Sequence, residues 1–264
     1  MVHTQKQNVM IGIFDSGAGG LSVFREIAKA LPREKCVYYS DSANCPYGEK
    51  SQEFIIDRAR QITDFLISKG CNIVVVACNT ATAAAISTLR KEYSIPFIGM
   101  EPAVKPAALS TRSGVVGVLA TAGTLKASKY LDTRDKYTGG VKVIEHVGQG
   151  FVELVESGDL DSPHAEKVVR ASVEPLTSAG ADIIVLGCTH YPFLRQTIQK
   201  VAGPDVTVID PAPAAAKHLV NVMRENGLLQ ETEGNENGGP KTAAIELFSS
   251  GDISALERIF KLVR

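Results

Sequence analysis

The chain of 264 residues has no tryptophan, few aromatic residues (6%) and no excess of charge of either sign. Its 28 basic and 29 acidic side chains leave a formal net charge of −1, and no segment is strongly basic. Proteins that bind nucleic acid usually carry a basic patch or stripe. We therefore expect no nucleic-acid partner.

No apolar run is long enough to span a bilayer, so no membrane partner is expected. The first eight residues are polar and lack the apolar core of a signal peptide. The chain has five cysteines, at positions 36, 45, 71, 78 and 188. Their number is odd, and a chain of this length does not need disulfide bonds to be stable. Reduced thiols in a cytoplasmic enzyme are the expectation.

Short β-branched runs alternate with amphipathic stretches along the whole chain, which is typical of a mostly parallel α/β architecture. Strands are predicted over residues 9–14, 36–40, 72–77, 95–100, 115–119, 141–147, 181–186, 206–209 and 243–248. Helices are predicted over residues 21–31, 49–69, 80–93, 125–137, 151–156, 162–179, 212–226 and 253–263. Pro102 and Pro106 predict a break in regular secondary structure between the strands 95–100 and 115–119. The polar segment 230–240 predicts an exposed loop.

Three segments recur in the same order at offsets of 105 to 110 residues. Residues 11–17 resemble 116–123, residues 76–80 resemble 186–190, and residues 100–103 resemble 209–212. A near-constant offset predicts two copies of one α/β unit. The third pair of segments would serve as crossovers. We expect one domain of residues 1–98 plus 208–264 and another of residues 99–207, with the active site in the cleft between these pseudo-symmetric, flavodoxin-like domains.

Two cysteines lie where a predicted strand leaves its sheet. Cys188 follows the run 181–186 and precedes Thr189 and His190, and Cys78 follows the run 72–77. The carboxyl edge of an open α/β sheet is where ligands bind, and domain interfaces are favoured ligand sites. If the two domains face each other, these thiols lie on opposite sides of one cleft.

Two facing thiols can invert a stereocentre without a cofactor, because a thiolate removes a proton from carbon and a thiol on the other face returns one. A free thiol has a pKa near ~8.5, so each needs tuning or a neighbouring base. Asp15 at the end of the first strand is a candidate partner of Cys78, and His190 is a candidate partner of Cys188. Hydroxyl and amide groups that could hold a substrate are those of Ser16, Asn79, Thr80 and Thr189.

The Gly-rich turn of residues 15–20 leads into a predicted helix and could present free backbone N–H groups to an anion. Its spacing differs from the dinucleotide fingerprint, and no P-loop lysine follows. A small carboxylate is therefore the better guess for a ligand at this turn.

The segments 11–21, Pro46-Tyr47-Gly48, 77–81 and 187–192 together resemble those of glutamate racemases, the cofactor-independent family within the aspartate/glutamate racemase superfamily. They occur in the family's order. The resemblance implies interconversion of L- and D-glutamate with no cofactor and no metal. The D-glutamate would be a precursor for peptidoglycan synthesis. It also implies a homodimer, since the family is often dimeric.

The resemblance also implies roles for individual residues. Cys78 would handle the α-proton of D-glutamate and Cys188 that of L-glutamate, with Asp15 and His190 as their helpers. The substrate would contact Asp15, Ser16, Pro46, Tyr47, Gly48, Asn79, Thr80, Thr189 and His190.

The family places a glutamate behind the second cysteine and its histidine, and alignment of residues 151–158 puts it at Glu156. Many members carry Ala-Cys-Pro before that helix, whereas residues 147–150 here read Val-Gly-Gln-Gly. Because of this difference Glu153 remains a rival for the same role.

Other interpretations stay open from the residues alone. A zinc site could be formed by Cys78, Cys188 and His190. Asp15 could serve as a helix cap and nothing more, and Glu156 could be an ordinary surface charge. Cys36, Cys45 and Cys71 are expected to be packing residues. At the level of function, an aspartate or hydantoin racemase is the nearest enzymatic rival, and an amino-acid-binding protein is the alternative of a different class.

Overall fold

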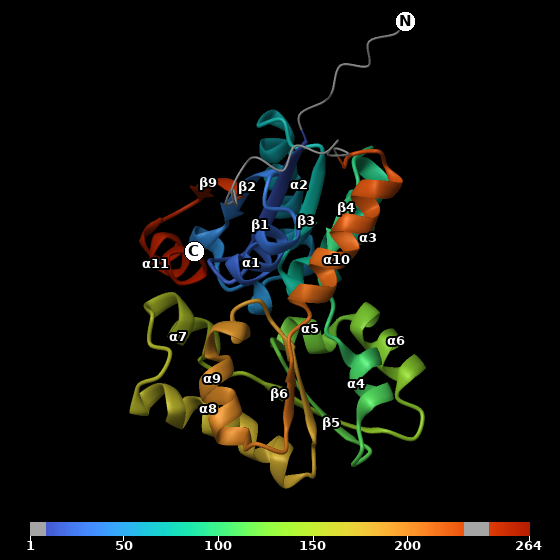
Figure 1. The fold of residues 1–264 in the computed structure, drawn as a ribbon, viewed down its shortest axis with the longest axis vertical. Coiled ribbons are helices and arrows are strands. Elements are labelled where there is room, and N and C mark those ends of the chain that lie inside the picture. The colour runs from blue at the N-terminus through green and yellow to red at the C-terminus, as the bar shows by residue number, and fades with distance from the viewer. Residues whose placement is uncertain (1–8, 230–242) are drawn as a thin grey trace, which may run out of the picture.

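The computed structural model describes residues 9–229 and 243–264, in two lobes that each contain one parallel sheet (Figure 1). The loop predicted over residues 230–240 lies outside the described residues. Within the described ranges, every strand pairing is parallel. The predicted fold class of two mostly parallel α/β units is confirmed.

The upper lobe in Figure 1 holds the first sheet, in the order β4-β3-β1-β2-β9. Its strands are β1 (Met10–Asp15), β2 (Lys35–Ser40), β3 (Ile73–Val76), β4 (Phe97–Gly99) and β9 (Ala244–Ser249). Its helices are α1 (Leu21–Ala30), α2 (Gln52–Ser68), α3 (Asn79–Glu92), α10 (Ala212–Glu225) and α11 (Ser254–Val263), with 3-10 turns η1 (Ser42–Asn44) and η2 (Tyr47–Glu49).

The lower lobe holds the second sheet, in the order β6-β5-β7-β8 (Figure 1). Its strands are β5 (Val115–Ala120), β6 (Lys142–Val147), β7 (Ile183–Gly187) and β8 (Thr207–Ile209). Its helices are α4 (Val104–Ser110), α5 (Ala122–Lys126), α6 (Ser128–Tyr137), α7 (Phe151–Ser157), α8 (Pro163–Ser178) and α9 (Arg195–Ala202), with the 3-10 turn η3 (Tyr191–Leu194).

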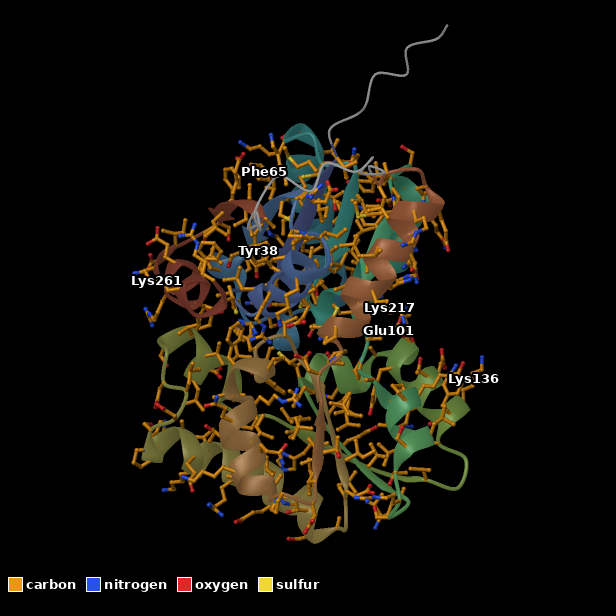
Figure 2. The ribbon with its side chains drawn as sticks, viewed as in Figure 1. Tyr38, Phe65, Glu101, Lys136, Lys217 and Lys261 are labelled. Atoms are coloured by element: carbon orange, nitrogen blue, oxygen red, sulfur yellow. The ribbon has the colours of Figure 1, made fainter. Side chains whose placement is uncertain are left out.

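The two sheets share one topology, since the first four strands of each lobe are arranged second-first-third-fourth. This order matches β1 with β5 and β3 with β7, the same strands that the recurring segments pair. Their C-terminal ends therefore carry Cys78 and Cys188 at equivalent positions. The chain passes to the lower lobe after β4 and returns after β8, and Glu101 lies at the level where the lobes meet (Figure 2).

Both faces of the central strands are buried, which explains their continuous apolar runs. Along β3, Ile73 and Val75 pack into one apolar cluster and Val74 and Val76 into another. The first of these clusters continues from the first sheet into the lower lobe, where it includes Phe151 and the end of β7. The lobes are thus joined by shared apolar packing as well as by the two chain crossings.

Three helical features differ from the prediction. Helix α4 forms where a proline break was expected, because Pro106 falls in its first turn, where a missing N–H costs nothing. Helix α9, for which no prediction was made, ends at Gly203 with φ +88°. The single helix expected over 125–137 is two, α5 and α6, separated by an extended Ala127.

No helix in the described ranges is both long and apolar enough to cross a membrane.

Candidate active site

Asp15 ends β1, the strand between β2 and β3, and its carboxylate is fully buried. Oδ2 accepts hydrogen bonds from the backbone N–H groups of Gly20 at 2.9 Å and Gly17 at 3.4 Å. The hydroxyl of Thr189, from the other lobe, donates to both carboxylate oxygens at 3.3 Å. Burial raises the pKa of Asp15, although the charge of His190 and the Gly20 N–H oppose that rise.

The Gly-rich turn after β1 binds the protein's own carboxylates. Besides the two N–H groups on Asp15, the N–H of Ala18 donates to Glu156 Oε1 at 2.8 Å. These three N–H groups thus already have carboxylate acceptors within the protein, and an external carboxylate at the rest of the turn stays a prediction. Asp15 thus accepts hydrogen bonds within this turn, and its role in catalysis stays a prediction.

Cys78 lies between β3 and α3 and is 5% exposed. Its sulfur is the N-cap of α3, accepting the N–H of Ala81 at 3.4 Å, and its thiol donates to Ser16 Oγ at 3.8 Å. Burial raises the pKa of the Cys78 thiol well above its usual range, and the negative charge of Asp15 raises it further. Cys78 is accordingly a neutral thiol near pH 7.

Cys188 follows β7 and is 8% exposed. Its sulfur lies 3.8 Å from Nδ1 of His190, whose Nε2 lies 2.7 Å from Oε1 of Glu156. The three groups form a chain from a thiol through an imidazole to a carboxylate. The glutamate on α7 that reaches the histidine is Glu156, whereas Glu153 is exposed.

The histidine and the glutamate shift each other's pKa values. Burial alone would lower the pKa of His190, but the neighbouring Cys188 sulfur and Glu156 carboxylate outweigh it and raise the pKa well above the usual value. Burial opposes ionisation of Glu156, but its hydrogen bond to His190 more than compensates and lowers its pKa. The two neighbours of His190 thus favour the protonated, cationic form of its imidazole.

Asn79, the first residue of α3, is 3% exposed, and both polar atoms of its side-chain amide lack a hydrogen-bond partner among the described residues. A buried amide without a partner costs free energy. It therefore offers one donor and one acceptor to a ligand that enters here.

Thr80 connects the two lobes. Its hydroxyl lies 2.9 Å from that of Thr121 and 3.3 Å from that of Thr124, both in the lower lobe. Thr121 and Thr124 were not among the predicted site residues. The recurring segments could have pointed to Thr121, because it occupies the place in the second copy that Ser16 occupies in the first.

The Pro46-Tyr47-Gly48 loop closes against the lower lobe, since a β-carbon on Gly48 would lie 3.2 Å from Thr121 Cβ. The side chain of Tyr47 is buried, and its hydroxyl donates to Asp41 Oδ2 at 2.5 Å. Asp41 in turn accepts from Arg58 Nη2 at 2.7 Å. The tyrosine ring and hydroxyl therefore anchor the loop.

Cys78, Cys188 and His190, the zinc ligands considered as an alternative, do not form a compact group of ligand atoms. Among the described residues, the histidine, cysteine and carboxylate atoms that lie within 4.8 Å of one another belong to Cys45, Glu156 and His190. Cys78 and Cys188 do not join that group. Cys45, expected to be a packing residue, thus lies beside two residues of the site.

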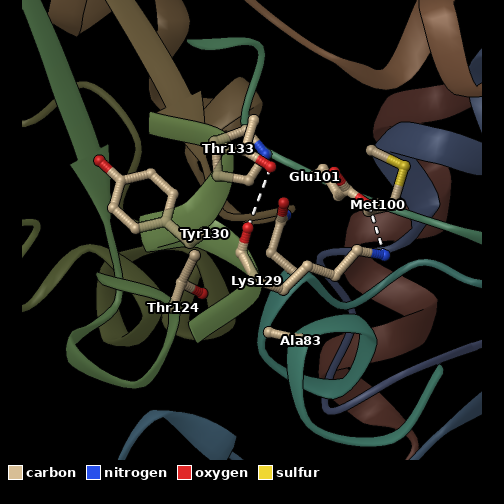
Figure 3. Close-up of a pocket in the computed structure, with 9 residues that line it drawn as sticks. Ala83, Met100, Glu101, Thr124, Lys129, Tyr130 and Thr133 are labelled. Carbon is tan, nitrogen blue, oxygen red and sulfur yellow. Dashed lines mark hydrogen bonds and ion pairs between the residues drawn. The ribbon is translucent and has the colours of Figure 1, made fainter. Parts of the chain in front are cut away.

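Asn79 also lines a small cavity between α3 and α6 (Figure 3). Its volume of about 20 Å³ has room for roughly one water molecule, not for an amino acid. Tyr130 and Thr124 line it, and Lys129 Nζ lies 2.6 Å from Glu101 Oε1 at its wall.

The chain resembles known proteins over most of its length. Residues 11–219 match the family model for Asp/Glu/Hydantoin racemase. The chain is 46% identical over 254 residues to the glutamate racemase of Stutzerimonas stutzeri, an alignment that covers 96% of this chain and 93% of that one.

Two solved structures share the fold over nearly the whole chain. Escherichia coli glutamate racemase, in complex with L-glutamate and an activator, superposes with a TM-score of 0.84 at 28% identity and covers 97% of this chain and 95% of that one. Francisella tularensis glutamate racemase, in complex with D-glutamate, gives 0.80 at 29% identity and covers 97% and 94%.

Proposed function

The chain belongs to the glutamate racemases of the Asp/Glu/hydantoin racemase family, and we propose that it interconverts L- and D-glutamate with Cys78 and Cys188 as paired acid and base. The observation that carries the proposal is the position of these two thiols, at equivalent strand ends of two lobes with one topology. Asp15 connects them, because its neighbour Ser16 accepts from Cys78 and its carboxylate accepts from Thr189, next to Cys188.

In this mechanism the sulfur of Cys188, as thiolate, takes the α-proton of L-glutamate while the thiol of Cys78 gives its proton to the opposite face. The Cα–H bond on one face breaks, an S–H bond forms at Cys188, and a new Cα–H bond forms from Cys78. The product is D-glutamate, and the two thiols have exchanged protonation states. In the reverse direction Cys78 takes the proton of D-glutamate.

The electrostatics support a resting state ready for the L to D direction. Burial and Asp15 hold Cys78 as a proton donor, and the His190 cation 3.8 Å from Cys188 stabilises negative charge on that sulfur. Glu156 stabilises the cation in turn. Asp15 is positioned to act on Cys78 for the D to L direction.

Glutamate offers two carboxylates and an ammonium group, which need donors and an acceptor. We propose that the unpartnered amide of Asn79 binds a substrate carboxylate, with Ser16, Thr80, Thr189 and the backbone of residues 46–48 completing the set. Fixed donors in a buried site would also stabilise the carbanionic character that develops at Cα. Both enantiomers of glutamate are bound by relatives of this chain.

The wider setting rests on the family resemblance. We propose a cytoplasmic homodimer that needs no cofactor and supplies D-glutamate for peptidoglycan.

The test is to incubate the purified chain, with no cofactor added, separately with L-glutamate, D-glutamate and L-aspartate and to separate the enantiomers by chiral chromatography. We expect both glutamate reactions to reach the same equimolar mixture and L-aspartate to remain unchanged. Racemisation of aspartate instead would contradict the substrate, and saturable glutamate binding without turnover would identify a binding protein.

A further inference from the structure

Cys45, Glu156 and His190 come from three separate segments and converge over Gly17. A β-carbon at Gly17 would lie 2.3 Å from Glu156 Oε1, 3.0 Å from Cys45 Sγ and 3.1 Å from His190 Nε2. All three ligand atoms thus face one small space, and the absence of a side chain on Gly17 keeps that space open.

We propose that Cys45, Glu156 and His190 form a binding site for Zn²⁺ that inhibits the enzyme. A thiolate, an imidazole and a carboxylate are the ligand types that zinc prefers, and three protein ligands leave a fourth tetrahedral position for water.

The geometry requires only a small rearrangement. Zinc bonds of about 2.1 Å at tetrahedral angles place neighbouring N and O ligands roughly 3.4 Å apart. His190 Nε2 and Glu156 Oε1 lie 2.7 Å apart with a proton between them, so they must separate by less than 1 Å as zinc replaces that proton. Glu156 is partly exposed, which leaves its side chain room to move.

The charge of the surroundings favours a cation. Asp15, Glu156, Cys78 and Cys188 all raise the pKa of the Cys45 thiol, after burial as the largest cause. The carboxylates of Glu156 and Asp15, which disfavour a lone thiolate there, attract Zn²⁺, and the metal displaces the thiol proton on binding.

Inhibition follows from the dual use of His190. Its Nδ1 faces the sulfur of Cys188, and its Nε2 would be bonded to the metal. A metal-bound imidazole is fixed in one tautomer and can no longer exchange its proton with Glu156. This inhibition rests on the proposed racemase function, whereas the binding of zinc does not.

The experiment compares the wild-type chain, Cys45→Ala and the matched control Cys71→Ala, which removes a buried thiol elsewhere. Zinc content is measured after equilibrium dialysis against a Zn²⁺ series, and glutamate racemisation is assayed on the same samples. Changes outside the ligand set already cost 10–100-fold in metal affinity, so we expect Cys45→Ala to bind zinc at least about tenfold more weakly. Its half-inhibiting Zn²⁺ concentration should rise by the same factor, with zinc-free activity close to wild type.

Cys71→Ala should bind zinc and be inhibited as the wild type is. Equal zinc binding and inhibition of Cys45→Ala and wild type would overturn the proposal, because zinc would then act on Cys78 and Cys188. A Cys45→Ser variant, checked by thermal unfolding, repeats the test if the alanine variant does not fold. Zinc binding that depends on Cys45 in a chain without racemase activity would refute the proposed function and leave the site intact.

Discussion

Cys78 and Cys188 differ in their surroundings although they occupy equivalent places in the two lobes. Cys78 caps α3 and neighbours Asp15, whereas Cys188 neighbours an imidazolium. A carboxylate beside one thiol and a cation beside the other push their protons in opposite directions, which is the asymmetry that a two-base reaction needs in each half-cycle.

Replacement of either thiol by a hydroxyl should remove one proton carrier. We expect Cys78→Ser and Cys188→Ser each to lower kcat for glutamate racemisation by about 10²–10⁴-fold, the usual range for loss of a general acid or base. Cys36→Ser serves as the matched control, since it places the same change in the core of the first sheet. Near-normal turnover in either single variant contradicts the two-thiol mechanism.

The His190–Glu156 pair should give a defined dependence on pH. The folded-state pKa of His190 is raised, so its contribution to stability is complete below about pH 6.5 and is lost as pH rises through the folded-state value. Glu156→Gln removes one cause of the rise. We expect a lower His190 pKa in an NMR titration and loss of that stability at lower pH.

The contribution of Glu156 to stability changes with pH in the opposite direction. The lowered pKa of Glu156 contributes stability above its usual value of 4.5. This stability is lost as pH falls through the folded-state value, and Glu156→Gln should abolish the dependence. Glu153→Gln, exposed on the same helix, is the control. An unchanged His190 titration in Glu156→Gln would show that the 2.7 Å contact does not set the charge of the histidine.

Much of the residue-level arrangement was predictable, since parallel strands bring their C-terminal ends to one edge. Asp15 is the last residue of such a strand, and Cys78 and Cys188 each lie just after one. The choice between Glu153 and Glu156 was not, because it depends on the rotation of a short helix whose buried face, Phe151, Leu154 and Val155, is fixed by tertiary packing. The Tyr47 hydroxyl likewise donates to Asp41, six residues earlier in the same loop, and no periodic pattern in the sequence reveals that pair.

At the scale of elements, α11 of the upper lobe holds the end of α7, which carries Glu156. Arg258 Nη1 donates to the carbonyl of Glu156 at 3.1 Å and also to that of Ser157. The last carbonyls of a helix have no partner within it, so an arginine there fixes the helix end. Gly158 ends α7 with φ +84°, and a β-carbon on it would lie 2.9 Å from Arg258 Cδ.

Arg258 should therefore act as a positioning residue for Glu156. We expect Arg258→Ala to lower kcat about tenfold, equivalent to about 1.4 kcal/mol, with a smaller change in KM. It should also lower the His190 pKa, and Arg258→Lys should restore part of both. Lys261→Ala, on the outer surface of the same helix (Figure 2), is the control. A change in stability without a change in the His190 titration would assign Arg258 a purely structural role.

The elements that sequence analysis missed are those with weak local signals. Helix α4 contains Pro106, which usually argues against a helix but is tolerated in a first turn. Helix α5 is only five residues long and begins after its N-cap Thr121, whose hydroxyl accepts the N–H of Thr124. Contacts with Thr80 in the other lobe help to hold these threonines, and such contacts leave no periodic pattern in the sequence.

At the scale of the whole molecule, we propose that residues 1–98 with 208–264 and residues 99–207 act as two domains that move relative to each other. The membership of the strands in two sheets supports this division, with β8 placing the second crossing at its C-terminal end. Both thiols are under a tenth exposed, so a substrate needs an opening to reach them, and we propose that separation of the lobes provides it.

Separation of the two lobes should control how fast a reagent in solution reaches the thiols of Cys78 and Cys188. We expect iodoacetamide to modify Cys78 and Cys188 slowly, and glutamate at ten times its Kd to slow the modification about tenfold further by favouring the closed form. Peptide mapping gives the rates for each thiol, and Cys36 in the core provides the internal reference. Rapid modification that glutamate does not affect would contradict closure around the substrate.

The most direct test of the account is the early exchange of the α-proton in D₂O, followed by NMR and mass spectrometry at low conversion. Two thiols on opposite faces predict that nearly all D-glutamate formed from L-glutamate carries deuterium at Cα, while the remaining L-glutamate keeps its proton. The same pattern should hold with the enantiomers exchanged. Protium in the early product, together with deuterium in the recovered substrate, would mean that a single base serves both faces and would contradict the paired roles of Cys78 and Cys188.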